Sequence, residues 1–412
     1  MSSPAPAPAS RGLPSAWNVV LGFGLVSLFA DMVYEGARSL YGPALLALGA
    51  SSAIVGLVSG AGEAMALVLR LFAGPVADRR GAHWSFTIVG YALTAVCVPL
   101  LWLSPQLGAA GLVFASTMIL LERAGKAVRS PSKSALLAYA AKAVGRGKGF
   151  GVHKALDQLG AFAGPLLMAA IVAATGSIWL GLGWLVVPGV IAMLVLLAIR
   201  RAVPDPSVYA PEQGAKQAAQ TSWWRGAMGT DLPGPFFGYA LAAALTTAGL
   251  VTFAVISVHL TRTLDVETAA VPLIYAGAML VEAMAALATG WAFDRWGSRV
   301  LLVVPVLVAT VPAMAFAPSL GWALVGVAVW ATAYGIQDST IKALVADLVP
   351  APQLATAYGI FAAIQGAFAI VGGFVAGWLL DVSIGWLIAV IGAAQAVAFL
   401  LLVVTLGRAR AR

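Results

Sequence analysis

Apolar segments long enough to cross a membrane recur along the whole chain, separated by short polar or turn-forming stretches. A helix of about 20 mostly apolar residues spans the hydrocarbon layer of a bilayer, which is roughly 30 Å thick. Twelve segments have this length, and they cover approximately residues 17–44, 51–76, 84–104, 109–138, 149–174, 177–200, 234–260, 267–292, 299–317, 320–346, 354–379 and 384–407. The pattern therefore predicts an all-α membrane protein with twelve transmembrane helices.

The longest polar stretch follows the sixth apolar segment and divides the chain into two halves. Each half contains six predicted helices, and duplicated six-helix bundles are a common plan for secondary transporters. We expect two pseudo-symmetric six-helix bundles, an N-terminal one at 17–200 and a C-terminal one at 234–407, joined by a cytoplasmic linker at 201–233. A disordered cytoplasmic tail at 1–16 precedes them, and a basic cytoplasmic tail at 408–412 follows them.

Composition and charge support a membrane location. Of the 412 residues, 61% are hydrophobic and only 10% are charged, whereas a soluble domain carries about 25% charged residues. The net charge is +8, and fifteen of the 24 Lys and Arg lie in the tails or in alternate connections between apolar segments. This asymmetry follows the positive-inside rule, so we expect both termini and the linker in the cytoplasm. The same distribution argues against a nucleic-acid partner.

A loop signature occurs once in each half, after the second and the eighth apolar segments. Residues 74–81 and 290–297 both read G-x-x-x-D-R-x-G, and both lie on the basic side. The chain therefore resembles the major facilitator superfamily of twelve-helix transporters. The resemblance implies that the loops form a gate, whose contacts stabilise one conformation and break in the other. Its residues are Gly74, Asp78, Arg79, Gly81, Gly290, Asp294, Arg295 and Gly297. The alternative is a tight turn that carries only a topology signal.

A second motif in segment 149–174 resembles the antiporter motif of the superfamily's exporters. It consists of Gly151, Gly160, Gly164 and Pro165, although Met168 and Ala169 stand where that motif ends in two glycines. The alternative role of these glycines is close helix packing. Residues 29–51 and 122–138 also resemble a bacterial subgroup whose members are mostly uncharacterised. This resemblance implies a location in a bacterial inner membrane.

Ionisable residues inside the apolar segments are the candidates for proton coupling. Each such residue costs at least about 2.5–3.5 kcal/mol in hydrocarbon, so a group on one helix face indicates a bundle interior or an aqueous cavity. Spacings of three and four residues place Asp31, Glu35 and Arg38 on one stripe, and His153 with Asp157 on another. We expect Asp31, Glu35, Asp157 and His153 to carry the coupling proton. The alternative is a set of structural ion pairs, Glu35 with Arg38 and Asp157 with Lys154 or His153.

Segment 109–138 has the densest set of charges. Glu122, Lys126, Arg129 and Lys133 share a face, with Arg123 beside them. This stripe predicts a cavity wall that attracts an anionic substrate, although Arg129 and Lys133 can instead reach the cytoplasmic surface, which we expect for Lys133. The full set of candidate cavity residues is Tyr34, Arg38, Glu122, Arg123, Lys126, Arg129, Lys154, Tyr275, Glu282, Tyr334, Gln337, Asp338, Lys342 and Gln365.

The sequence contains neither a nucleotide-binding loop nor a motif for zinc or nucleophilic catalysis. We therefore expect no enzyme activity, no cofactor and no metal. The predicted function is proton-coupled efflux of a small organic molecule by alternating access, with the alternative of proton-coupled uptake of an organic anion. A membrane-embedded enzyme or sensor would need a soluble domain or a catalytic cluster. The expected partners are a small-molecule substrate, protons and the lipid bilayer, and we expect a monomer.

Overall fold

The computed structural model describes residues 14–209, 232–349 and 353–410, without the side chains of Asp294, Asp338, Lys342 and several of their neighbours. Most of the predicted tail and linker therefore lies outside the described residues. Within the described ranges the chain folds into helices and forms no strand, which confirms the predicted all-α class.

The N-terminal half contains eight α-helices in the described residues. They are α1 (Ala16–Arg38), α2 (Tyr41–Ala47), α3 (Ser52–Arg80), α4 (His83–Leu100), α5 (Gly111–Val144), α6 (Arg146–Thr175), α7 (Ile178–Trp184) and α8 (Val186–Ala202). Two short 3-10 helices, η1 (Leu101–Ala110) and η2 (Pro206–Tyr209), accompany them.

The described C-terminal half contains seven α-helices. They are α11 (Gly234–Gly249), α12 (Phe253–Arg262), α13 (Val271–Trp296), α14 (Val303–Ala315), α15 (Leu320–Leu348), α16 (Leu354–Val382) and α17 (Ile384–Arg410), with the 3-10 helix η3 (Gly297–Leu302) before α14.

Eleven stretches of the described chain are long and apolar enough to cross a membrane. The longest, His83–Val144, contains both α4 and α5. The chain turns back between these two helices, where Gly108 has a φ of 54° that suits glycine. Counting α4 and α5 separately gives the twelve spans that the sequence predicts.

Three of the predicted spans are broken, between α1 and α2, between α7 and α8, and between α11 and α12. The last break leaves the Val251 carbonyl outside the helical ladder, and the indole of Trp330 donates a hydrogen bond to it at 2.6 Å. Such a partner is needed in a membrane, because water is absent and an unpaired backbone group is costly. A side chain of α15 thus stabilises a break in α11–α12 that the apolar pattern does not reveal.

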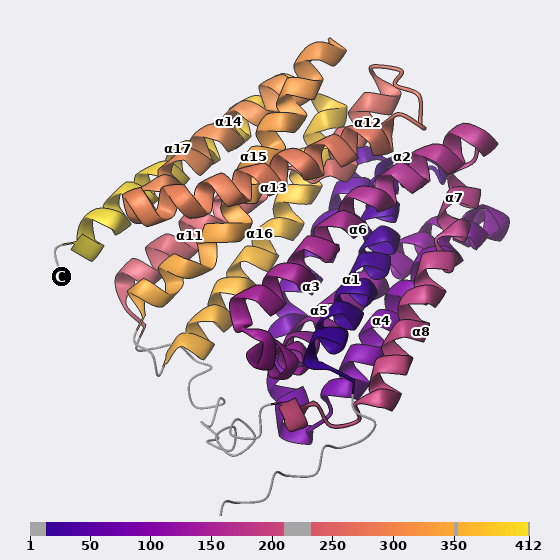
Figure 1. Ribbon diagram of the computed structural model, residues 1–412. Helices are drawn as coiled ribbons and strands as arrows, with labels where there is room; N and C mark the ends of the chain where they lie inside the picture. Colours follow the sequence, from indigo (N-terminus) through magenta and orange to yellow (C-terminus); the bar gives the residue numbers. More distant parts are fainter. Residues whose placement is uncertain (1–13, 210–231, 350–352, 411–412) are drawn as a thin grey trace, which may run out of the picture.

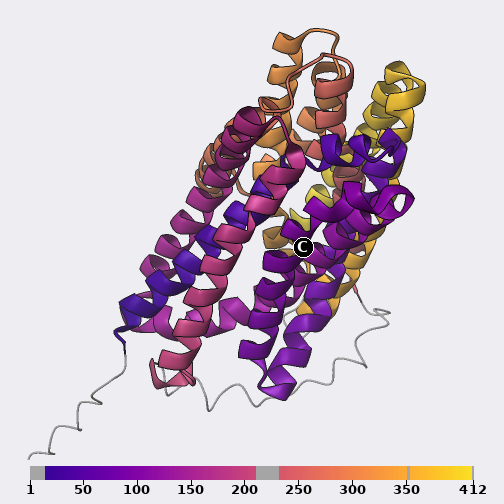
Figure 2. The same ribbon diagram turned by 90° about the vertical axis from the view of Figure 1, so that its right-hand side faces the viewer.

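The first and last helices start and finish at the same end of the bundle. We call this end, where α1 begins and α17 ends, the terminal end (Figures 1 and 2). At the other end, which we call the closed end, α2 contacts α12 and α3 contacts α16 across the two halves. The two groups of helices diverge toward the terminal end (Figure 1).

Glycines allow the close contact of α3 with α16. A Cβ atom added to Gly56 would lie 2.0 Å from the carbonyl oxygen of Gly373, and one added to Gly377 would lie 2.0 Å from that of Ser52. Side chains at these positions would therefore separate the helices. The closed end is sealed by backbone packed directly on backbone.

A polar contact joins the halves at the same end. The carboxylate of Asp381, at the end of α16, accepts hydrogen bonds from the backbone N–H and the hydroxyl of Ser52, at 3.1 and 2.8 Å. Arg262 of α12 donates to the same carboxylate at 2.6 Å. Ser52 is the first residue of α3, so Asp381 satisfies a free N–H group at a positive helix terminus.

Candidate functional site

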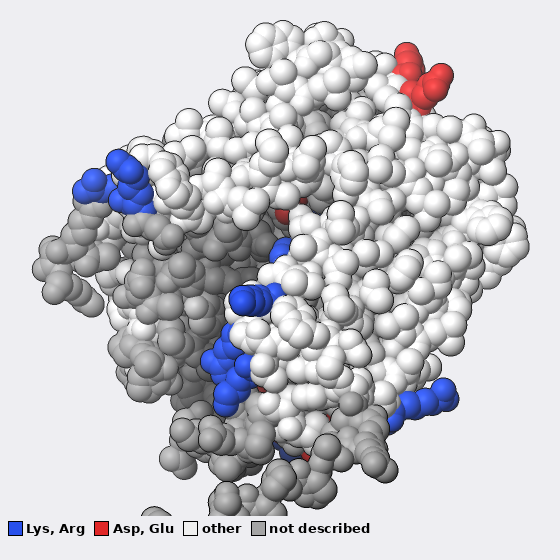
Figure 3. Space-filling view, viewed as in Figure 1, with Lys and Arg blue, Asp and Glu red and all other residues white. Residues whose placement is uncertain are grey.

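A cavity of about 390 Å³ lies between the two halves. Its walls come from α1, α3, α5 and α6 on one side, and from α11, α13, α15 and α16 on the other. Figure 3 shows the hollow on the molecular surface, with Lys and Arg side chains along one edge. Because the halves separate toward the terminal end and pack together at the closed end, the cavity opens toward the terminal end.

Most of the sequence-predicted residues line this cavity. The described ones are Asp31, Tyr34, Glu35, Arg38, Arg123, Lys126, Arg129, Lys154, Asp157, Glu282, Tyr334, Gln337 and Gln365. Asp338 and Lys342 lie on α15, but their side chains are outside the described part of the structure.

Three predicted residues are buried beside the cavity instead. Glu122 lies behind the wall, with a carboxylate oxygen 3.9 Å from Arg123. Tyr275 donates a hydrogen bond to Glu35 at 2.6 Å, which connects α13 with α1 across the halves. His153 is hydrogen-bonded to the Ser27 hydroxyl at 2.9 Å.

Two charged residues of α3 belong to the site, although the sequence analysis did not select them. Glu63 and Arg70 both line the cavity, seven residues apart on one face of the helix. The rule that selected Asp31 applies equally to these residues, so the signal was present in the sequence.

Lys133 also differs from its expected place. It lines the cavity and donates to the Ser27 hydroxyl at 3.1 Å, rather than extending to the cytoplasmic surface. Arg129 is buried with only 4% exposure, and it donates hydrogen bonds to the Thr94 hydroxyl and to the Gly90 carbonyl. The charged face of α5 thus forms part of the cavity wall along its length.

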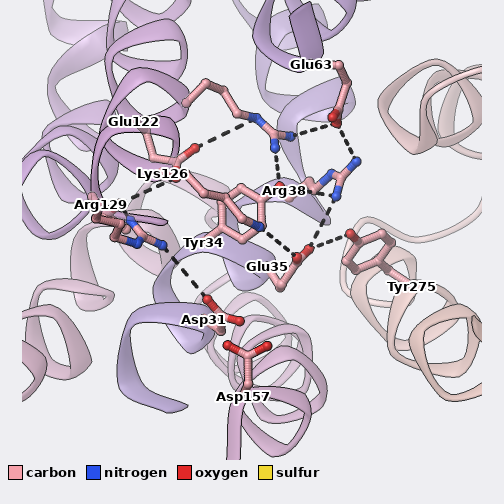
Figure 4. Close-up of polar contacts among 12 residues, drawn as sticks. Asp31, Tyr34, Glu35, Arg38, Glu63, Glu122, Lys126, Arg129, Asp157 and Tyr275 are labelled. Atoms are coloured by element: carbon pink, nitrogen blue, oxygen red, sulfur yellow. Dashed lines mark hydrogen bonds and ion pairs between the residues drawn. The ribbon is translucent and has the colours of Figure 1, made fainter. Parts of the chain in front are cut away.

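A network of charged and aromatic side chains occupies the deep part of the cavity (Figure 4). Glu63 lies 2.7 Å from Arg38 and 3.3 Å from Arg123, so one carboxylate joins two guanidinium groups. Both arginines also donate hydrogen bonds to the hydroxyl of Tyr34. The ammonium of Lys126 lies over the Tyr34 ring, 3.5 Å from its centre. Opposite charges therefore balance one another in this region.

Two carboxyl groups face each other in the part of the cavity nearer the terminal end. Figure 4 shows the carboxyl groups of Asp31, from α1, and Asp157, from α6, next to each other. Arg129 is 3.9 Å from Asp31, and Lys154 is 2.9 Å from Asp157. A hydrogen bond between two carboxyl groups requires a proton on one of them, because carboxylates only accept. This arrangement can hold one proton between two helices.

The predicted gate residues lie at the terminal end. Gly81 ends α3 with a φ of 58°, and Gly297 ends α13 with a φ of 61°. Asp78 contacts the imidazole of His83 at 3.3 Å, and its side chain is 54% exposed. Arg79 follows Asp78 in α3. Both loops therefore contain a glycine with a positive φ, a conformation that residues with a Cβ atom rarely adopt.

The remaining gate residues are on α13. Gly290 has open space where a side chain would stand, and Arg295 lies 5.9 Å from the centre of the Trp291 ring. The Asp294 side chain is outside the described part of the structure.

The antiporter-like motif forms a helix contact. A Cβ atom on Gly160 would lie 2.1 Å from the Leu28 carbonyl oxygen, and one on Gly164 would lie 2.4 Å from that of Met32. Pro165 is buried next to Gly164, whereas Gly151 has open space around it. Two of the three glycines thus allow α6 to pack directly on the backbone of α1.

Solved structures of transporters have the same fold. A mutant of the nucleoside transporter NupG aligns with a TM-score of 0.75 at 16% identity, over 94% of this chain and 100% of that one. A bacterial homolog of the human lysosomal transporter Spinster, in an inward-facing and unoccupied conformation, aligns with a TM-score of 0.64 at 17% identity, over 98% and 96% of the two chains. At these identities the likeness concerns the fold alone.

Relatives by sequence match either nearly the whole chain or a part of it. An uncharacterized protein of Mycobacterium tuberculosis is 44% identical over 398 residues, which are 96% of this chain and 94% of the relative. An uncharacterized MFS-type transporter of Methanocaldococcus jannaschii is 32% identical over 151 residues, which are 36% of each chain. The sequence pattern of the Major Facilitator Superfamily matches residues 23–248 and 236–412. With its apolar spans and central cavity, the chain belongs to the major facilitator superfamily.

Proposed function

We propose that this multi-pass membrane transporter exports a small organic molecule in exchange for protons, by alternating access. It acts as a monomer in a bacterial inner membrane, with both termini in the cytoplasm. The observation that carries the proposal is the carboxyl pair of Asp31 and Asp157 in the cavity wall (Figure 4). The other groups selected for coupling, Glu35 and His153, are nearby on the same two helices.

The pair couples protonation to charge inside the cavity. With a proton, the two groups carry one negative charge and hold α1 against α6. Without it, two like charges face each other at short range, and the cations Arg129 and Lys154 are drawn to them more strongly. A coupling ion drives transport only through its different affinity for two conformations, and this change in charge supplies such a difference.

The two ends of the bundle support alternating access. The closed end is held by the α3–α16 packing and by the contact of Asp381 with Ser52 and Arg262. In the opposite conformation these contacts break, and the loops at 74–81 and 290–297 take over the seal at the terminal end. The exposed side chain of Asp78 is available for that contact.

Efflux is favoured by the glycine packing of α6 on α1, because it corresponds to the antiporter-like motif. The second candidate is proton-coupled uptake of an organic anion, which the basic wall of α5 favours. Both directions use the same carboxyl pair, so the test of coupling does not depend on the choice between them.

Coupling can be measured without knowing the substrate. Two spin labels at the terminal end, one in each half, report the separation of the halves while the pH is varied. We expect the wild-type distance distribution to change between mildly acidic and mildly alkaline buffer, because the pair loses its proton. Asp31→Asn and Asp157→Asn should each remove most of this pH response, whereas Asp205→Asn, at an exposed aspartate of the same end, should retain it.

Transport in proteoliposomes provides the second readout once a screen supplies a substrate. Asp31→Asn and Asp157→Asn should abolish accumulation driven by a proton gradient and leave substrate exchange intact, since the cavity is kept. If both variants keep the pH response and full proton-driven flux, the pair is not the coupling site.

A further inference from the structure

Positive charge is confined to one side of the cavity. Seven Lys and Arg and five Asp and Glu line its described part, and all seven cations belong to the N-terminal half. The described wall of the C-terminal half contributes one charged residue, Glu282, beside neutral groups such as Tyr334 and Gln337. A substrate that fills the cavity therefore meets a basic wall on one side and, on the other, a wall whose described polar side chains are neutral except for Glu282.

The deep cations are already matched by acids. Arg38 and Arg123 share Glu63, at 2.7 and 3.3 Å. Lys126 and Arg129 each have a carboxylate of α1 at 3.9 Å. These ion pairs leave little uncompensated charge near the closed end of the cavity.

Two cations nearer the mouth are not matched in this way. Within the described residues, neither Arg70 nor Lys133 has a carboxylate oxygen within 4.0 Å, and the Nε of Arg70 is buried without a hydrogen-bond acceptor. Lys133 follows Arg123 by ten residues on α5, which is about 15 Å along the helix toward the terminal end. Asp157 interacts with Lys133 at longer range but is already paired with Lys154 at 2.9 Å, and seven cations face five acids in the described lining. Arg70 and Lys133 therefore place the surplus positive charge of the cavity close to its open side.

We propose that Arg70 and Lys133 form the entry site for an oxyanion group of the substrate, so that the transported molecule is a small organic anion. The inference rests on the transport function proposed above and holds for either direction. A guanidinium presents a planar pair of donors to a carboxylate, sulfonate or phosphate, and an ammonium adds a mobile third donor. Uncompensated cations in a partly buried cleft also attract anions from solution and repel cations.

The neutral wall indicates the rest of the molecule. Tyr334 offers an aromatic face, and Gln337 and Gln365 both donate to the hydroxyl of Thr247, at 2.8 and 3.0 Å. A volume of about 390 Å³ suits a compact organic body with one acidic group.

Binding of matched compounds tests the inference. The purified protein, in nanodiscs of a zwitterionic lipid, is titrated calorimetrically with phenylacetate, octanoate and glucuronate, each compared with its uncharged amide. We expect at least one anion to bind about tenfold or more tightly than its amide, and to weaken as salt is added. Arg70→Gln and Lys133→Gln should each weaken binding of that anion about tenfold. Arg70→Lys keeps the charge but loses the planar pair of donors, so it should weaken binding less than Arg70→Gln.

Arg200→Gln is the matched control, because Arg200 is an exposed cation of the terminal end outside the cavity lining. The inference is overturned if every anion binds no better than its amide, or if the Arg70 and Lys133 variants behave like Arg200→Gln. It is also overturned if anionic lipid in the nanodisc abolishes binding of the anion, since a lipid headgroup then occupies the site.

These outcomes are separate from those of the proton-coupling test, which uses no ligand. If the conformation depends on pH but no anion binds, the proposed proton-coupled transport is supported and the proposed anionic substrate is rejected. If an anion binds but the conformation does not depend on pH, the anionic substrate is supported and proton coupling is rejected.

Discussion

The glycine contact between α3 and α16 gives a direct way to shift the protein between conformations. In the structure, a Cβ atom on Gly56 would meet the Gly373 carbonyl oxygen at 2.0 Å and the carbonyl carbon at 2.8 Å. Ordinary contacts of a Cβ atom begin near 3.4 Å. Gly56→Ala therefore requires α3 and α16 to separate by an ångström or more at the closed end.

The expected energy follows from the nature of the clash. The obstructing atoms belong to backbone, so no flexible side chain can move aside, and overpacking of this kind costs about 1–3 kcal/mol. If α3 and α16 separate in the alternative conformation, only the conformation described here bears the cost. A difference of about 1–3 kcal/mol changes the ratio of two states by roughly 5–150-fold.

Spin-label distances across the closed end measure this shift. Labels at Ala47 on α2 and Glu267, in the connection before α13, are both exposed and belong to different halves. The buried Cys97 is replaced by Ala to give a background free of other thiols. We expect Gly56→Ala to move most of the distance distribution to longer values.

Gly277→Ala is the matched control, because Gly277 lies within α13 and has no atom within 4 Å of an added Cβ. The reasoning is refuted if Gly56→Ala and Gly277→Ala give the same distribution as the wild type. A similar melting temperature for both variants would show that the difference reflects conformation rather than unfolding.

Two further predictions concern the polar contacts at the ends. Asp381→Asn should destabilise the conformation with a packed closed end by about 1 kcal/mol, because it removes the ion pair with Arg262 and weakens the cap on α3. A wild-type distance distribution across the closed end would contradict this expectation. Asp78→Asn should leave the melting temperature and the conformation with an open terminal end unchanged, since Asp78 is half exposed there and, among the described side chains, forms its ionic contact with His83. The same variant should slow transport severalfold in proteoliposomes, and a wild-type rate would mean that the loop is only a turn.

The helical architecture could be predicted from the sequence because hydrocarbon imposes one rule on every span. Backbone groups must be satisfied within the segment, so apolar length alone identifies a helix and its approximate ends. The breaks inside spans could not be predicted in the same way. Leu250 and Val251 are as apolar as their neighbours, and the indole that satisfies the break comes from Trp330, 79 residues later.

The candidate site was visible to the extent that it consists of charges in apolar helices. Asp31, Arg123 and Lys126 stand out for that reason, and Glu63 and Arg70 follow the same rule. Asp381 was not distinguishable, because it sits at a helix end, where charged residues are ordinary. Its partner Ser52 is 329 residues away, and no local pattern connects the two.

The carboxyl pair of Asp31 and Asp157 shows why the pattern of charges in the sequence does not by itself predict which residues meet in a site. Helical spacing places Asp31 on one face of α1 and Asp157 on one face of α6, but it does not say whether those faces meet. The meeting depends on Gly160 and Gly164, whose missing side chains let α6 lie against the backbone of α1. A larger residue at either glycine would push the helices apart and separate the two carboxyl groups. If the pair carries the coupling proton, as proposed above, the antiporter-like glycines act on coupling through packing, because they set the distance between the two carboxyl groups.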